Sequence, residues 1–438
     1  MVPGTAKETE LFWKVYKVTM QVYNTYPYDY LLNEAQSLLA RIKQVKPFSM
    51  TMPMVRGASI SWMALKKIMN LLEKSKRELY HSICEFIKEV KNAKEHQTVK
   101  ACDLQQAFII KKLRYNSILD QLDIFADVLS QRAEHETGIW LSGLDVLAED
   151  GLTNGKEYFE IPPLMVFLER GHGAAIRRAR TRLPGGDENP VAVIQIPRER
   201  MVGSGIASSL IHEVGHQAAE SLELTQKLRI ELGNMKKNTA KNNIAWQLYE
   251  RWISEILADC WALGHLGITA TMGLMGVVTL PKYFQFRLDL DDPHPAPYVR
   301  VKLSCAFGKA LFPGEQWDLL WNLWSTFYDT DDLAEDKKLI LQALAEEETG
   351  FVNLILQYKP DTLKGKTIAE IFPVEERQPA KLKQLFITWK QQPQLLDRAA
   401  PTLVFAVLGQ AKYDLVLNAA DESRMLSMQL QRWAYRRN

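Results

Sequence analysis

Residues 203–216 of this chain read GSGIASSLIHEVGH. Small, turn-forming residues open the stretch, and Ser204 is suited to cap a helix that the following apolar residues predict. His212 and His216 are four residues apart, so the two imidazoles lie on one face of that helix. One divalent ion can bind both rings, and zinc is the ion that this spacing favours.

Glu213 directly follows His212, which turns its side chain about 100° away around the helix. From there the carboxylate is poorly placed as a third ligand. It can instead reach a water molecule held by the ion and take its proton as a general base. Gly215 has no side chain, so another element can approach the helix closely. A helix with two surface histidines and no metal is the simpler alternative.

A catalytic zinc keeps three protein ligands and one open position, so a third ligand has to come from elsewhere in the chain. Glu255 is the predicted donor, on a helix expected over residues 243–264. Asp259 lies one turn further on, where it can accept the free N–H of a ligating histidine and hold its tautomer. Cys260 is a competing ligand, although a buried structural thiol is the favoured role.

Residues 292–300, DPHPAPYVR, end one element and begin another, with proline near the start of the new helix. His294, Tyr298 and Arg300 are predicted donors to the oxyanion that forms on an attacked carbonyl. A rigid turn in which Arg300 pairs with a structural carboxylate is the equally open alternative.

The HExxH motif at 212–216, followed by Glu255 and Asp259, resembles the metal-binding pattern of the gluzincin zinc metallopeptidases. The segment from His294 to Arg300 is similar to the HPxxxxR signature of the CAAX-processing-type membrane gluzincins. The resemblance covers about residues 190–310. The chain lacks clear membrane spans flanking these motifs, unlike that membrane group, so a soluble variant is the closer picture.

The resemblance implies a role for each motif residue. The zinc ligands are His212, His216 and Glu255, the general base is Glu213, the carboxylate behind a ligating histidine is Asp259, and the contacts to the substrate or the oxyanion are His294 and Arg300. The resemblance also implies that the enzyme hydrolyses peptide bonds.

Residues 191–196, VAVIQI, are rich in β-branched side chains and predict a strand. Pro190 and Pro197 bracket this strand, which is typical of the edge of a sheet. An edge strand beside a metal site can bind an extended peptide by adding it to the sheet. Glycines and prolines between residues 151 and 189 predict short strands and loops before it.

Long helices are predicted on both sides of this central region. Apolar residues recur at three- and four-residue steps over 59–93 and 103–134, which predicts an antiparallel helical hairpin. Trp317, Trp321 and Trp324 form a stripe that is expected to pack into core. The expected fold is mainly α (α+β), with an N-terminal helical region over 1–150, a zincin-like metallopeptidase core with a small mixed β-sheet over 151–312, and a C-terminal helical region over 313–438.

Residues 261–280 form a long apolar stretch whose only ionisable side chain is that of His265. A run of about twenty such residues is long enough to cross a bilayer. Four glycines interrupt it and it adjoins the expected metal site, so a buried helix or helix pair is the favoured interpretation. Membrane association is left open but not favoured. His265 and His172 are weaker candidates for metal ligands, and structural roles are favoured for both.

The 438 residues carry a formal net charge of +2, so no overall field favours nucleic acid as a partner. Basic residues on the predicted hairpin are interpreted as a solvated face. The four cysteines are scattered and form no CxxC pair, which argues against a disulfide scaffold. The first residues lack a basic segment followed by an apolar one, so we expect a cytoplasmic protein.

These patterns predict a zinc-dependent metallopeptidase whose substrate is a peptide or a flexible protein segment, with Glu213 as the base. Ligand spacing does not distinguish this enzyme from a zinc hydrolase of a non-peptide amide in a biosynthetic pathway. A metal-stabilised helical binding or regulatory protein is a further alternative. Glu213 argues against it, because a purely structural zinc has no need of a base. The sequence does not indicate the oligomeric state.

Overall fold

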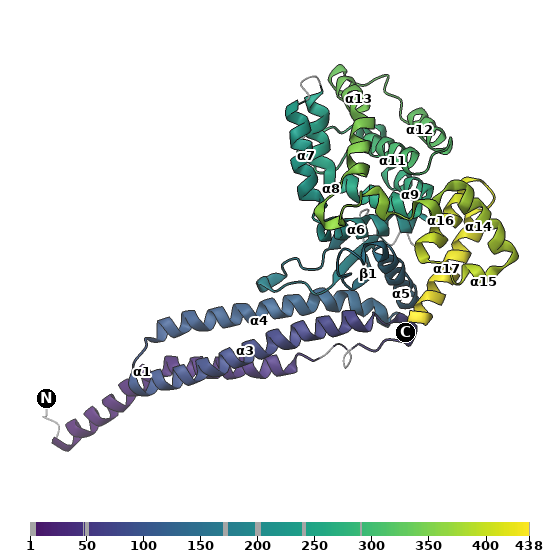
Figure 1. Cartoon of the computed structure of the whole chain (residues 1–438). Helices are drawn as coiled ribbons and strands as arrows, with labels where there is room; N and C mark the ends of the chain where they lie inside the picture. Colours follow the sequence, from purple (N-terminus) through teal and green to yellow (C-terminus); the bar gives the residue numbers. More distant parts are fainter. Residues whose placement is uncertain are drawn as a thin grey trace. The chain divides into compact units, whose positions relative to one another are not determined.

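A computed structural model describes residues 6–46, 48, 52–169, 174–197, 203–238, 242–289 and 291–437. The described chain is mainly α-helical with one small mixed sheet, as predicted (Figure 1). Its internal contacts divide it into two compact units. The first comprises residues 1–53, 65–130 and 182–188, and the second comprises residues 54–64, 131–181 and 189–438.

Three long helices supply most of the first unit: α1 (Ala6–Gln44), α3 (Trp62–His96) and α4 (Ala101–Ser130). Helices α3 and α4 run antiparallel beside each other (Figure 1). Their apolar stripes meet that of α1 in one core, where the rings of Phe86 and Phe108 stack 5.8 Å apart. The predicted helical hairpin is therefore confirmed.

A short segment from later in the sequence, residues 182–188, completes this unit. Asp187, in residues 182–188, accepts hydrogen bonds from Arg114 (2.7 Å) and Gln121 (2.8 Å) of α4. Helix α5 (His135–Asp150), which the predicted N-terminal helical region over 1–150 includes, belongs to the second unit.

Helices also dominate the second unit, around one extended apolar core. After α5 they are α6 (Gly205–Ser221), α7 (Leu224–Asn238), α8 (Asn243–Leu266), α9 (Ile268–Val278), α10 (Lys282–Gln285), α11 (Pro297–Leu311), α12 (Gln316–Phe327), α13 (Glu335–Gln357), α14 (Pro379–Gln391), α15 (Pro393–Leu396), α16 (Pro401–Tyr413) and α17 (Ala419–Arg437).

The sheet contains β1 (Leu164–Glu169), β2 (Ala175–Arg177) and β3 (Ala192–Pro197), in the order β1-β3-β2. The strand predicted over 191–196 is present, but the edge position predicted for it is wrong. β3 is the middle strand, parallel to β1 and antiparallel to β2. Its prolines lie before its first residue and at its last, so they remove no donor from the strand interior. Its near-continuous apolar run suits burial on both faces.

Helices α6 and α8 pack closely against each other because Gly215 has no side chain. A methyl group at residue 215 would lie 2.8 Å from Ala258 Cα and 2.9 Å from Trp261 Cβ, well inside van der Waals contact. The close approach expected at Gly215 is therefore confirmed. Ser204 precedes α6 as predicted, but its hydroxyl forms no capping hydrogen bond. Its backbone N–H donates instead to Glu422 Oε1, at 3.2 Å.

The apolar stretch 261–280 forms the end of α8 and all of α9, with a reversal at Gly267, where φ is +58°. Nearly all of the residues before the last turn of α9 are buried in the core, so the interpretation as a buried helix pair is confirmed. Among the described residues, no helix has both the length and the apolar character needed to cross a membrane.

The predicted tryptophan stripe lies on α12. Trp317 and Trp324 are each 1% exposed and belong to the core, as predicted. Trp321 is half-buried, and its ring lies 5.1 Å from that of Tyr298 on α11. The stripe therefore packs inward at two of its three positions and borders a cavity at the third.

His265 is a buried, neutral residue near the end of α8. Its Nδ1 lies 2.9 Å from the Trp261 carbonyl oxygen, and its Nε2 is buried with no hydrogen-bond partner among the described residues. Burial lowers the pKa of His265 to about 4. The Trp261 carbonyl opposes this shift and the charge of Arg377 adds to it.

We expect Gly215→Ala to lower the free energy of unfolding by about 1–3 kcal/mol, because the methyl group forces α6 and α8 apart. Gly276→Ala is the matched control, since its added carbon meets no atom within 4 Å. That change should be neutral or stabilise by up to about 1 kcal/mol. Urea unfolding measures both. Equal stabilities of the two variants would contradict the packing argument.

The His265 environment predicts a loss of stability in acid. In the unfolded chain this histidine titrates near pH 6.5, above its folded pKa of about 4. Protonation therefore favours unfolding as the pH falls from about 6.5 towards 4. Between pH 7 and pH 5 the wild type should lose about 2 kcal/mol more than His265→Gln, measured by urea unfolding at each pH. The same pH dependence in both proteins would refute this origin.

Candidate metal centre

Three side chains from two helices converge in the second unit. His212 and His216 come from α6 and Glu255 from α8. His212 Nε2 lies 3.4 Å from Glu255 Oε2, and His216 Nε2 lies 3.3 Å from Glu255 Oε1. One donor atom from each residue falls within 4.8 Å of the other two. The three residues are 11–14% exposed, so the cluster is recessed but accessible.

These separations fit the donor atoms of a single zinc ion. Tetrahedral zinc with bonds of about 2.0–2.2 Å places neighbouring ligand atoms about 3.3–3.5 Å apart. Direct charge-assisted hydrogen bonds are shorter, about 2.7–2.9 Å. The observed 3.3 and 3.4 Å are longer than such bonds, and they run to different oxygens of Glu255. One ion bound to both histidines would therefore be held by both carboxylate oxygens, or by one of them after a small turn of the carboxylate. Two imidazoles and one carboxylate are also a donor set that catalytic zinc uses.

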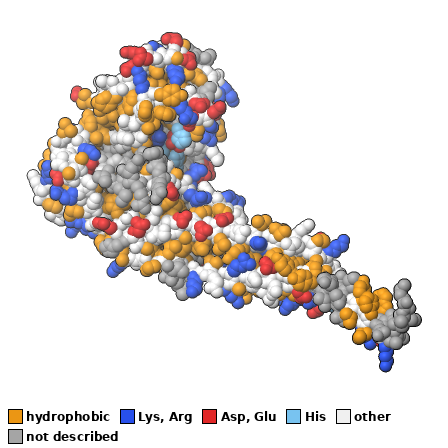
Figure 2. All heavy atoms as spheres, turned by 180° about the vertical axis from the view of Figure 1, so that it is seen from behind, with side chains coloured by type: hydrophobic (Ala, Val, Ile, Leu, Met, Phe, Trp, Pro, Cys, Tyr) orange, Lys and Arg blue, Asp and Glu red, His pale blue; other side chains and the backbone are white. Residues whose placement is uncertain are grey.

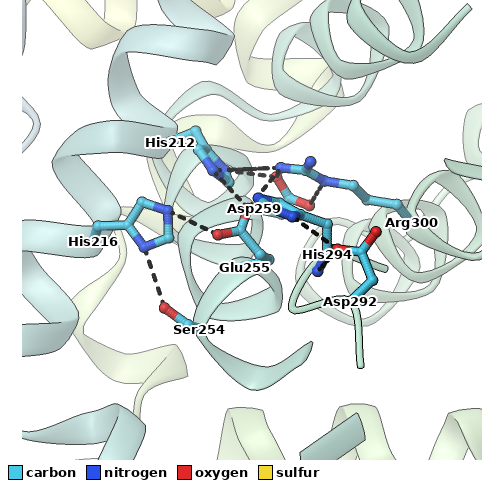
Figure 3. A network of polar contacts seen from close by, with 8 residues as sticks. All are labelled: His212, His216, Ser254, Glu255, Asp259, Asp292, His294 and Arg300. Carbon is cyan, nitrogen blue, oxygen red and sulfur yellow. Dashed lines mark hydrogen bonds and ion pairs between the residues drawn. The ribbon is translucent and has the colours of Figure 1, made fainter. Parts of the chain in front are cut away.

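A second layer of polar groups orients the three donors (Figure 3). Asp259 Oδ1 lies 2.8 Å from His212 Nδ1, as predicted, which leaves Nε2 of that ring for a metal. Ser254 Oγ lies 3.4 Å from His216 Nδ1 and orients the second ring in the same sense. Nε2 of each ring therefore faces Glu255.

Arg300, on α11, binds the carboxylate behind the histidine. Its Nε and Nη2 donate to the two oxygens of Asp259 at 2.5 and 2.8 Å, and Nη2 lies 3.7 Å from Glu255 Oε2. This favours the alternative interpretation of Arg300, in which it pairs with a structural carboxylate. The residue also lines the cavity described below, so it borders the site where substrate contact was predicted.

The buried charges shift one another's proton affinities. Burial alone would lower the pKa of His212, but the charge and hydrogen bond of Asp259, with help from Glu255, raise it to about 9. Burial would raise the pKa of Glu255, yet the two histidines and Arg300 hold it well below its usual range. The pKa of Asp259 is also lowered. Burial would raise it, but the charge of Arg300 has the larger opposing effect. Both carboxylates are therefore ionised, and in the metal-free site a proton on His212 competes with a cation.

Glu213 differs from the other carboxylates of the site. It is 6% exposed and lines the cavity, and its carboxylate has no hydrogen-bond partner among the described residues. Burial raises its pKa, while the neighbouring histidines act in the opposite direction. A general base works best when its pKa approaches the working pH, so both the position and the direction of the shift suit proton transfer.

The site opens into a cavity of about 450 Å³. His212, Glu213, His216, Glu255, Asp259, His294 and Arg300 all line it, so seven of the eight predicted site residues meet here. Leu274 and Val277 of α9 form an apolar wall, and residues 174–176 of the β2 edge form another side. Figure 2 shows pale-blue histidine side chains reaching the molecular surface, with hydrophobic and charged groups around them.

Tyr298 is the predicted site residue that the structure places elsewhere. Its ring lies 4.7 Å from that of Phe286 and 5.1 Å from that of Trp321, and it borders a different cavity. The prediction that it donates to the oxyanion is therefore wrong. Residues two positions apart on a helix differ by about 200° in direction. Tyr298 therefore points away from the metal cluster when Arg300 faces it.

Two polar residues of the site were missed by sequence reasoning. Asp292 lies 3.1 Å from His294 Nδ1 through its Oδ1 and also accepts the backbone N–H of His294, at 3.0 Å. Ser254 directly precedes Glu255. The aspartate two residues before His294 is a recognisable turn signal, whereas nothing local marks Ser254.

Two of the other ligand candidates, Cys260 and His265, do not join the cluster. Cys260 is buried, and burial raises the pKa of its thiol well above its usual range, in line with the structural role that was favoured. His265 lies in the core beside Trp261 and Phe372. His172 falls outside the described residues.

Comparisons with known proteins give this chain no relatives: no family model, curated protein or solved structure matches it.

The geometry predicts that the purified chain binds about one zinc ion. Glu255→Gln should abolish most of that binding, and Asp259→Asn should weaken it roughly 10–100-fold, because the tautomer of His212 is no longer held. Glu250 lies on the same helix in a half-buried ion pair with Lys236, away from the cluster, so Glu250→Gln should leave the affinity unchanged. Metal analysis with a competing chelator measures this. Wild-type affinity in Glu255→Gln would exclude Glu255 as a ligand.

Proposed function

We propose that this chain is a zinc-dependent metallopeptidase of the gluzincin type, built on a zincin-like core. One observation supports this most strongly. Nε2 of His212 and of His216 lie 3.4 and 3.3 Å from the two oxygens of Glu255, and Glu213 lines the same cavity. A purely structural site has no use for a buried, unpaired carboxylate next to its ligands.

Zinc held by His212, His216 and Glu255 would supply Lewis acidity, polarising a carbonyl and bringing the pKa of a water molecule to about 7. Glu213 then takes a proton from the attacking water and passes it to the leaving nitrogen. Asp259 keeps the Nδ1 proton of His212 in place, and Arg300 keeps Asp259 ionised.

His294 is proposed to donate to the oxygen that becomes negative on the attacked carbonyl. It lines the cavity, and Asp292 Oδ1 lies 3.1 Å from its Nδ1. Nε2 donates when the ring carries a proton on both nitrogens, because in the neutral ring with a proton on Nδ1 it is an acceptor. Its side chain is 61% exposed, so a bound substrate would have to cover it. Donors aimed at developing charge in a closed site stabilise the transition state more than they do in water.

A peptide is the substrate that the sheet favours. β2 pairs with β3 on one side, and among the described residues no strand pairs with its other side. Residues 174–176 line the cavity, so an extended peptide has backbone partners beside the metal cluster. The edge that was expected of β3 is therefore supplied by β2.

Zinc content and turnover, measured together, distinguish the two alternative functions from a peptidase. A hydrolase of a non-peptide amide would use the same ligands and the same base. A metal-stabilised binding protein would retain zinc without turnover. A cytoplasmic location is also part of our proposal, supported by four cysteines that form no disulfide.

We expect Glu213→Gln to retain zinc but to lose peptide hydrolysis by roughly 10²–10⁴-fold, because the proton acceptor is gone. The measurement is cleavage of a fluorogenic peptide library by zinc-loaded protein, with metal content determined in parallel. Glu250→Gln serves as the control and should cleave like the wild type. Unimpaired cleavage by Glu213→Gln would refute the mechanism. Zinc-loaded wild type that hydrolyses simple amides but no peptide would transfer the proposal to the non-peptide class.

A further inference from the structure

A second cavity, of about 330 Å³, lies between α8, α11, α12 and α13. It is at the small end of the roughly 300–1,000 Å³ that ligand pockets occupy. Its lining differs from that of the metal centre, and no residue lines both cavities. Neither the metal ligands nor the proposed base contributes to it.

Aromatic rings form one wall of this cavity. Tyr298 and Trp321 meet edge to face, with ring centroids 5.1 Å apart. Tyr249 forms the base, held by its stacking on Phe351 and by its hydroxyl donating to the Leu344 carbonyl at 2.8 Å. The Tyr298 hydroxyl has no hydrogen-bond partner among the described residues. The wall is therefore apolar and rigid, with a free polar group at one point.

Three charged residues line the rest of this cavity. Lys302 and Glu348 form a loosely associated pair of opposite charges, and Lys338 donates to the Asp331 carbonyl at 2.8 Å. Lys302 Nζ lies 3.7 Å from Glu348 Oε2, too far for a good hydrogen bond, and 5.4 Å from the centre of the Trp321 ring. Their side chains are 26% and 21% exposed. Burial raises the pKa of Glu348, which Lys302 counteracts. Both charges are partly stripped of water without being fully satisfied by each other.

We propose that this cavity binds a small zwitterion, a free α-amino acid with an aromatic or apolar side chain. An amino acid carries its ammonium and carboxylate on the same carbon, so it can place one opposite Glu348 and the other opposite Lys302 at once. The side chain then lies against Trp321 and Tyr298. A simple anion would leave Glu348 repelled, and a simple cation would leave Lys302 repelled.

The binding test uses L-phenylalanine as the probe with full-length wild-type protein, followed by calorimetry and by tryptophan fluorescence. We expect saturable binding to one site per chain. 3-Phenylpropionate lacks the ammonium group and 2-phenylethylamine lacks the carboxylate, so each should bind at least about tenfold more weakly, a loss of about 1.4 kcal/mol. Equal binding of either compound would overturn the zwitterion assignment.

Variants locate the binding. Lys302→Met and the near-isosteric Glu348→Gln should each weaken L-phenylalanine binding at least about tenfold. Lys309→Met is the matched control. Lys309 lies on the same helix as Lys302, in an exposed ion pair with Asp318 of α12, and its replacement should change nothing. Circular dichroism confirms folding of each variant. Unchanged affinity in a folded Glu348→Gln protein, or no saturable binding by the wild type, would overturn the proposal.

The same titration in Glu255→Gln, with a chelator present, separates this cavity from the metal centre. Binding should persist there, because none of the lining residues is a proposed zinc ligand. Loss of binding in that variant would place the amino acid at the metal cluster and overturn the second site. The result is independent of whether the chain hydrolyses peptides.

Discussion

The metal cluster depends on the contact between α6 and α8. Gly215 lets the backbone of Ala258 approach α6 closely enough to bring the carboxylate of Glu255 to the two imidazoles. A methyl group at this position would lie 2.8 Å from Ala258 Cα, so the two helices would have to move apart. The glycine inside the HExxH motif therefore allows the short distance between α6 and α8. That distance brings His212 and His216 close to Glu255.

The second constraint is electrostatic. Two carboxylates, two imidazoles and a guanidinium lie together with little access to water, and each is stabilised by a specific neighbour. Arg300 neutralises Asp259, which in turn holds the Nδ1 side of His212. Glu213 lies beside this chain of contacts without joining it through any hydrogen bond among the described residues. The arrangement separates the charges that hold the site together from the one that is free to exchange a proton.

Helix α11 contributes to two cavities through its periodicity. Arg300 turns towards the metal cluster, while Tyr298 and Lys302 face the cavity shared with α12 and α13. Trp321 is half-buried for the same reason: it borders that cavity, whereas its neighbours in the stripe lie in the core. One short helix thus forms part of a recessed polar site and part of an aromatic pocket without any break in its backbone.

Local patterns in the sequence determined the helices and the residues that meet at the cluster. The four-residue spacing of His212 and His216, the one-turn spacing of Glu255 and Asp259, and the apolar periodicity of the hairpin each depend only on the geometry of a helix. Tertiary structure decided two features that helix periodicity does not determine: the order of the strands and the rotation of α11. The order of the strands made β2 rather than β3 an edge, because pairing across the sheet joins segments that are distant in the chain. The rotation of α11 directed Tyr298 away from the site, because the direction a helix face takes depends on what packs against it.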